Sequence, residues 1–236
     1  MTILEFVSEP EPCAYLPDQS SVHRNRVVGR LTPEAYERLL DEGWRKFGPV
    51  LYRPECPRCD ACRPLRIPVE TFAPNRSQRR CLRANADLVV ARDRPVVDSE
   101  RLRLHNRYHR ARERDRGWPE TERTAEEYER GFLLNPVPAV EVSARLNGRL
   151  VGVALLDFTP SIVSGVYHYH DPELTSRGLG TFLMLHAITL AEQTGRRWAH
   201  FGYHVADCPS LSYKSKFQPC EIRDRDGVWR AMEHAP

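Results

Sequence analysis

The sequence has little lysine and no long apolar run. Of its 35 basic residues only Lys46, Lys214 and Lys216 are lysines, so nearly every positive charge is a guanidinium, which suits phosphate and carboxylate. No apolar stretch approaches the roughly 18–20 residues that cross a bilayer, so we expect no membrane span. The N-terminus has neither a basic start nor an apolar core, as a signal peptide would. We therefore expect a cytoplasmic protein whose seven cysteines are free or metal-bound.

Three cysteines, Cys56, Cys59 and Cys62, follow one another at intervals of three in a proline-rich stretch. This spacing lets three sulfurs converge from one loop, as a thiolate-bound metal or iron–sulfur cluster requires. A disulfide between neighbours would need a strained small ring, so ligation is favoured over bridging. The alternative is three incidental thiols in a turn, because spacing alone does not identify a fourth ligand.

The positive charge is concentrated in the first half of the chain. Residues 1–118 carry 23 Lys and Arg against 17 Asp and Glu, whereas residues 119–236 carry 12 against 15. Within the first half, residues 99–116 hold seven arginines and only three acids. This segment is either a nucleic-acid-binding surface or a solvated helix face.

Periodicity and turn signals predict an α+β fold. Three strand-like runs are followed by a glycine-containing loop, a long apolar helix and a further strand, an order typical of an N-acetyltransferase-like core. The loop 176–181 would place backbone N–H groups around an anion, although Gly178 and Gly180 also suit a plain turn into a helix. The predicted strands are 65–69, 87–91, 138–146, 149–158, 161–169 and 198–203, and the predicted helices are 31–47, one opening at 75–83, 99–116 and 179–194.

Several short motifs, in this order, resemble those of one family. They are Glu11-Pro-Cys13-Ala-Tyr15-Leu-Pro17, Tyr52-Arg-Pro54 with the three cysteines, Pro74-Asn-Arg76-Ser-Gln-Arg79-Arg80, Tyr167-x-Tyr169-x-Asp171-Pro172, Leu179-Gly-Thr181, Gly202-Tyr203 and Tyr213-Lys214-x-Lys216-Phe217-x-Pro219. Together they resemble the arginyl-tRNA–protein transferase family, and within it the bacterial aspartate/glutamate leucyltransferase (leucyl-tRNA–protein transferase) branch. Ser210-Leu211 departs from the Lys-Met that this family often has.

The resemblance implies an enzyme, an aminoacyltransferase, with two parts. These are a cysteine- and arginine-rich module over residues 1–93 and an aminoacyl-transferase domain with the N-acetyltransferase-like (GNAT) core over residues 94–236. The enzyme would move leucine, or less readily arginine, from charged tRNA to the N-terminal amine of proteins that begin with Asp or Glu, marking them for N-degron degradation. The ester is already activated, so the chemistry requires no cofactor.

The resemblance also suggests roles for particular residues. Arg76 and Arg79, three apart, would share a helix face and read the acidic side chain of the acceptor, or else contact tRNA phosphate or solvent. Asp171 would hold the acceptor ammonium or help to remove its proton, unless Asp-Pro is only a turn, and Tyr203 is grouped with it as catalytic. The remaining expectations are pocket-shaping tyrosines, Tyr167 and Tyr169; an anchor for the CCA end, Tyr213, Lys214 and Phe217; and ligands of an iron–sulfur cluster or zinc, Cys13, Cys56, Cys59 and Cys62.

Two other functions compete with this interpretation. A CoA-dependent N-acetyltransferase would explain the loop with Gly178 and Gly180 but not the cysteines or the arginines. A non-catalytic, metal-dependent RNA-binding module would explain the cysteines and arginines but predicts no turnover.

Overall fold

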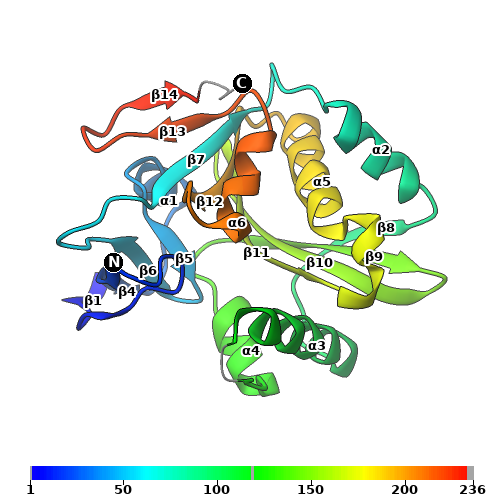
Figure 1. Ribbon diagram of the computed structural model, residues 1–236, viewed down its shortest axis with the longest axis horizontal. Coiled ribbons are helices and arrows are strands. Elements are labelled where there is room, and N and C mark those ends of the chain that lie inside the picture. The colour runs from blue at the N-terminus through cyan, green and yellow to red at the C-terminus, as the bar shows by residue number, and fades with distance from the viewer. Residues whose placement is uncertain (1, 118–119, 233–236) are drawn as a thin grey trace.

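The computed structural model describes residues 2–117 and 120–232, which form a mixed α+β molecule around one large sheet (Figure 1). The eight strands of this sheet lie in the order β14-β13-β7-β12-β11-β10-β9-β8. In chain order they are β7 (Arg63–Pro68), β8 (Val89–Asp93), β9 (Ala139–Leu146), β10 (Arg149–Phe158), β11 (Ile162–His170), β12 (Trp198–His204), β13 (Glu221–Arg223) and β14 (Trp229–Ala231).

A second, smaller sheet forms the N-terminal part. Its strands β1 (Thr2–Val7), β4 (His23–Val28), β6 (Val50–Pro54) and β5 (Arg45–Phe47) are neighbours in that order, and β2 (Glu11–Pro12) pairs with β3 (Ser20–Ser21) beside it. Helix α1 (Pro33–Asp41) begins at Thr32, whose side chain accepts the Ala35 N–H. We predicted a helix over 31–47, but it ends at Asp41 because Gly43 turns the chain at a φ of +90°.

Helices cover both faces of the large sheet (Figure 1). Helix α5 (Leu179–Gln193) packs its apolar side chains on one face, with α2 (Arg76–Ala84) beside it. Helices α3 (Ser99–Arg116) and α4 (Ala125–Phe132) cover the other face. Strand β10 is buried on both faces, which explains its continuous apolar sequence.

In the C-terminal half, turn residues in the sequence mark the ends of the strands. Asn147 and Gly148 join β9 to β10 with φ angles of +49° and +82°, as a two-residue hairpin turn requires. Two strands from the first 93 residues, β7 and β8, pair with β12 and β9, so the large sheet contains strands from both sides of position 93. The division into residues 1–93 and 94–236 stays a prediction.

Two neighbouring strands separate and open a gap in the large sheet. Strands β11 and β12 pair in parallel only from Ile162 to Ser164 opposite Trp198 to His200, and no pairing continues beyond Ser164. Just beyond this point β11 carries a bulge: Leu155 and Leu156 of β10 pair with Tyr167 and Gly165, so Val166 is an extra residue in β11. Beyond Ser164 and His200 the two strands do not pair with each other, and their residues line a cavity.

Short helical segments complete the chain. The 3-10 turn η1 (Pro172–Arg177) leads into α5, and α6 (Pro209–Ser212) leads into η2 (Tyr213–Lys216). Among the described helices, none is long and apolar enough to cross a membrane.

Candidate active site and cysteine cavity

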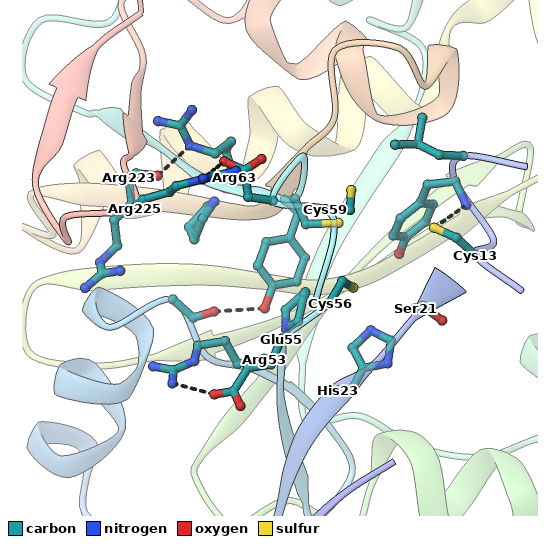
Figure 2. Close-up of a pocket in the computed structure, with 18 of the residues that line it drawn as sticks. Cys13, Ser21, His23, Arg53, Glu55, Cys56, Cys59, Arg63, Arg223 and Arg225 are labelled. Carbon is teal, nitrogen blue, oxygen red and sulfur yellow. Dashed lines mark hydrogen bonds and ion pairs between the residues drawn. The ribbon is translucent and has the colours of Figure 1, made fainter. Parts of the chain in front are cut away.

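Four cysteines line a cavity of about 700 Å³, which we call the cysteine cavity. Figure 2 shows Cys13 on one side of it and Cys56 and Cys59 on the other. Cys62 lines the same cavity, and burial, reinforced by the other three thiols, raises its pKa to about 12. The structure therefore brings together all four of the predicted ligands.

The donor set of this cavity fits a four-thiolate centre in kind and number. The Cys13 sulfur accepts the Tyr15 N–H at 3.4 Å and the Cys56 sulfur accepts the Val22 N–H at 3.4 Å, contacts that support thiolate ligands. Over residues 2–117 and 120–232, no three His, Cys, Asp or Glu side chains are assembled as a metal site. The zinc or iron–sulfur centre stays a prediction.

Three of the four arginines that line the cysteine cavity are paired with acids (Figure 2). Arg53 donates to Glu55 at 2.8 Å, Arg63 pairs with Asp224, and Arg225 pairs with Asp60. A surface whose guanidinium groups are neutralised in this way has little remaining attraction for an anion.

A second cavity, of about 510 Å³, occupies the gap between β11 and β12, and we call it the strand-gap cavity. Its wall contains β11 from Gly165 to His168, the first turn of α5 and the Phe201–Tyr203 end of β12. Tyr15 and Tyr203 line both cavities, so the two are neighbours. Four cations line this second cavity, and none of its lining residues is Asp or Glu. These four are Arg45, Lys46, Arg112 and Lys214.

Lys214 is an unusual lysine in this wall. Its side chain is 8% exposed, and Nζ donates to the Tyr203 carbonyl oxygen at 2.8 Å. Burial, reinforced by the nearby Arg45, lowers the pKa of Lys214 to about 7. Near neutral pH Lys214 can therefore exist as a free amine and accept a proton.

Two histidines face the start of α5. A side chain at Gly180 would lie 3.5 Å from His168 Nε2 and 3.4 Å from His170 Nε2. Burial, reinforced by His170 and Lys214, lowers the pKa of His168 to about 3, so its imidazole is neutral at pH 7. Such a weak base is less suited than Lys214 to take a proton from an amine.

The N-terminus of α5 also opens toward this cavity. Gly178 precedes the helix with a φ of +63°, and no side chain caps the helix start. Leu179, Gly180 and Thr181 line the cavity, so the positive end of the 15-residue helix dipole faces it. The start of α5 therefore lines this cavity, and the backbone anion cradle stays a prediction.

Four more residues were predicted to bind substrate, and only two of them line the strand-gap cavity. Tyr213 and Tyr167 line the strand-gap cavity, and the Tyr167 hydroxyl bonds His109 Nε2 at 2.7 Å. Tyr169 is fully buried, with its hydroxyl 2.6 Å from that of Tyr128, because it packs into the core under α3 and α4. Phe217 is 2% exposed and belongs to the core. Tyr169 and Phe217 line neither cavity.

The two predicted catalytic residues are both occupied by protein groups. Asp171 is fully buried and its carboxylate accepts Arg107 and Arg149, each at 2.9 Å, and the Glu173 N–H at 3.1 Å. The Tyr203 hydroxyl donates to the Gly43 carbonyl oxygen at 2.8 Å, and burial raises its pKa well above the usual range. Asp171 therefore joins α3, β10 and η1, whereas Tyr203 joins the wall of both cavities to the turn that follows α1.

Arg76 and Arg79 lie on the exposed surface of α2. This helix begins at Asn75, and the Gln78 side chain donates to the Lys216 carbonyl oxygen at 3.1 Å. Neither arginine lines either cavity, so their predicted role in reading the acceptor stays a prediction. Arg45, in β5, lines the strand-gap cavity but belongs to none of the family motifs. Its position became evident only from the separation of β11 and β12, which forms this cavity.

Comparison with known proteins agrees with this arrangement. Residues 11–80 match the family described as arginine-tRNA-protein transferase, N terminus, and residues 100–224 match its C terminus. The chain belongs to the arginine-tRNA-protein transferase family. The resemblance inferred from the motifs is thus confirmed.

Similar curated proteins carry one name. Proteins named aspartate/glutamate leucyltransferase are 40% identical in Halorhodospira halophila over 86% of each chain, and 39% identical in Aeromonas hydrophila over 87% of this chain and 85% of the relative. The protein of that name in Pseudomonas aeruginosa is 34% identical over 92% of each chain.

Two solved structures share the fold at 12% identity. The C-terminal domain of a putative lysylphosphatidylglycerol synthetase from Agrobacterium fabrum matches 86% of this chain with a TM-score of 0.52, and this chain covers 64% of that structure. FemX matches 86% of this chain with a TM-score of 0.51, and 69% of its own chain is covered. The α+β fold with an N-acetyltransferase-like core is confirmed.

Proposed function

We propose that this protein transfers leucine from leucyl-tRNA to the N-terminal amine of proteins that begin with Asp or Glu. The observation that carries the proposal is the 34–40% identity, over 86–92% of the chain, to proteins named aspartate/glutamate leucyltransferase. Donor and acceptor are assigned by analogy with those relatives. The strand-gap cavity, with its buried cations and an open helix N-terminus, is the place we assign to the reaction.

The reaction is aminolysis of an ester. The acceptor amine attacks the leucyl carbonyl carbon, a C–N bond forms, and the C–O bond to the terminal ribose breaks as the ribose oxygen takes a proton. The ester is already activated, so holding both reactants together is the main task, an effect worth up to about 7–11 kcal/mol. Backbone N–H groups at the start of α5 would stabilise the tetrahedral oxyanion, worth about 3–4 kcal/mol.

Lys214 is the residue we assign to the proton. The acceptor must lose a proton to attack, and α-amines have ordinary pKa values near 7.7–8.0. The lowered pKa of Lys214, about 7, is close enough for Nζ to receive that proton. This assignment replaces the anchoring of the CCA end that we expected for Lys214, because an 8% exposed residue is poorly placed to meet the solvated backbone of a tRNA.

The cysteine cavity has a supporting role in this proposal. Cys13, Cys56, Cys59 and Cys62 would hold zinc or an iron–sulfur cluster. Such a centre would order the loop that carries three of its ligands. Because the shared wall of Tyr15 and Tyr203 separates it from the strand-gap cavity, its loss should affect stability or tRNA binding before the chemical step.

The cellular context follows from the substrates. Charged tRNA and newly exposed protein N-termini are cytoplasmic, so we place the enzyme there. Leucine added to an acidic N-terminus would mark the acceptor for N-degron degradation.

The test is a transfer assay with two donors and four acceptors. Labelled leucine or arginine, each on its own tRNA, is offered with peptides that begin with Asp, Glu, Arg or Lys. We expect label from leucyl-tRNA on the Asp and Glu peptides only. Arginine transfer to the same peptides would reassign the donor, and leucine transfer to Arg or Lys peptides would reassign the acceptor.

A further inference from the structure

Arg45 is a buried cation that forms no ion pair among the described residues. Its side chain lines the strand-gap cavity and the residue is 6% exposed. Its Nη2 donates to the Gly165 carbonyl oxygen at 2.7 Å, which joins β5 to β11. Within residues 2–117 and 120–232, no carboxylate lies within ion-pair distance of Arg45.

Two other buried cations, Lys46 and Arg101, do have such partners. Lys46, the next residue, lies 3.3 Å from the Asp157 carboxylate, and Arg101 lies 2.5 Å from that of Glu141. Burying an unpaired charge costs several kcal/mol, so proteins rarely keep one without a use. The missing partner of Arg45 is therefore expected to come from a ligand in the cavity.

A carboxylate fits Arg45 better than a phosphate does. The guanidinium is a planar fork that binds a carboxylate through two parallel hydrogen bonds, and only Nη2 is engaged by Gly165. A backbone phosphate of tRNA is attached to the chain on both sides and would have to bring both attachments into a buried site. An amino-acid side chain enters such a site end first.

Arg45 and Lys214 are close enough for one Asp or Glu residue of an acceptor to contact both. Gly202, at a φ of +75°, lies between them, and a side chain there would be 3.7 Å from Arg45 Nε and 3.7 Å from Lys214 Nζ. Because Gly202 has no side chain, none of its own atoms lies between the two cations. In Asp or Glu the α-nitrogen and the carboxylate are about 3–5 Å apart, so with a hydrogen bond at each end one residue can reach both.

We propose that Arg45 binds the side-chain carboxylate of the acceptor's first residue, while the α-amine of that residue lies toward Lys214. Arg45 is then the residue that makes the enzyme specific for acidic N-termini, in place of Arg76 and Arg79. This inference rests on the proposed function and goes beyond it by naming the residue that reads the acceptor.

The experiment compares leucine transfer to matched peptides that begin with Asp or Asn, and with Glu or Gln. In the Arg45→Gln variant we expect kcat/KM for the Asp and Glu peptides to fall about 30-fold or more, since one partner of a buried ion pair is removed. The Asp-to-Asn ratio should collapse, and Arg45→Lys, which keeps the charge but not the fork, should lie between. Leucyl-tRNA affinity should stay at the wild-type level, which also shows that the variant is folded.

Arg76→Gln is the matched control, because it removes an exposed arginine of α2 and should leave the Asp-to-Asn ratio unchanged. An unchanged ratio in Arg45→Gln, or a collapse in Arg76→Gln, would overturn the inference. A large loss of leucyl-tRNA affinity in Arg45→Gln would assign Arg45 to phosphate and overturn it as well. If the wild type transfers no leucine, the proposed function itself fails, which is a separate result.

Discussion

At the scale of single residues, burial decides which groups can react. Lys214 and Asp171 are both buried charged residues in segments that the family motifs marked, yet they differ in their partners. Asp171 has two arginines and a backbone N–H, whereas Lys214 has a single carbonyl oxygen and the repulsion of Arg45. The family motifs mark both residues, but their burial and their different partners become visible only in the fold.

The pH dependence of transfer tests the role of Lys214. Burial lowers its pKa to about 7, so the neutral amine is the major form above pH 7 and is lost below it. The groups that act on Nζ are Arg45, which lowers the pKa, and Cys62 and Cys208, which raise it. We expect kcat/KM to rise about tenfold per pH unit up to about 7 and then to level off.

The control for this profile is Lys214→Met. It should lower the rate and leave only a rise near pH 7.7–8.0, the ordinary range of the peptide amine. A wild-type profile that is flat between pH 6 and pH 7 would contradict the assignment.

Substitution of one cysteine tests the proposed centre. Cys59→Ser should lower the melting temperature and weaken leucyl-tRNA binding, while the single-turnover rate at saturating tRNA changes less than about threefold. Metal analysis of anaerobically purified protein should show the loss of zinc or iron in Cys59→Ser. Cys81→Ser is the control, because Cys81 lies outside the cysteine cavity. Equal metal content in wild type and Cys59→Ser would count against the centre.

At the scale of elements, the sequence predicted most of the fold. Asn147-Gly148, the apolar run of α5 and the Thr32 cap of α1 were sufficient signals, because turns, helix periodicity and caps depend on neighbouring residues. Strand β5 was missed, since its three residues continued the helical pattern of α1. The separation of β11 from β12, which forms the strand-gap cavity, depends on pairing between distant segments and has no local signal in the sequence.

A buried ion pair should hold α3 on the large sheet. Arg101 of α3 donates to the Glu141 carboxylate of β9 at 2.5–2.9 Å, and Glu141 is 1% exposed. Arg101→Met should leave this carboxylate unpaired and lower the free energy of unfolding by about 3–5 kcal/mol. Urea denaturation measures this decrease. The double variant Arg101→Met with Glu141→Leu should recover most of it, and a double variant as unstable as the single one would contradict this explanation.

At the scale of the whole molecule, exposed arginines gather on α2 and α3. Arg103, Arg110 and Arg114 are exposed on α3 at helical spacing, and four further arginines are exposed on α2. Changing the three α3 arginines to Gln should weaken leucyl-tRNA binding and reduce the slope of log affinity against log salt by about 0.7–0.9 for each phosphate that is no longer bound. Arg38→Gln on α1 is the control. An unchanged salt slope in the triple variant would assign this stripe to solvent.

The family could be identified from the order of motifs in the sequence, but the location of each residue in a cavity, in the core or on the surface could not. Four cysteines predicted to act together do share a cavity, whereas Arg76 and Arg79 lie on the outside and Arg45 was not considered. The sequence gives the identity and order of the residues directly. Burial and the pairing of charges arise only when the chain folds.

The most direct test of leucine transfer is mass spectrometry of an Asp-initiated peptide after incubation with the wild-type protein. With leucyl-tRNA present, we expect a product heavier by one leucine residue, attached at the peptide's α-amine, and no product when the tRNA is uncharged. An acetylated peptide formed from acetyl-CoA, or no product from leucyl-tRNA, would contradict the proposed function.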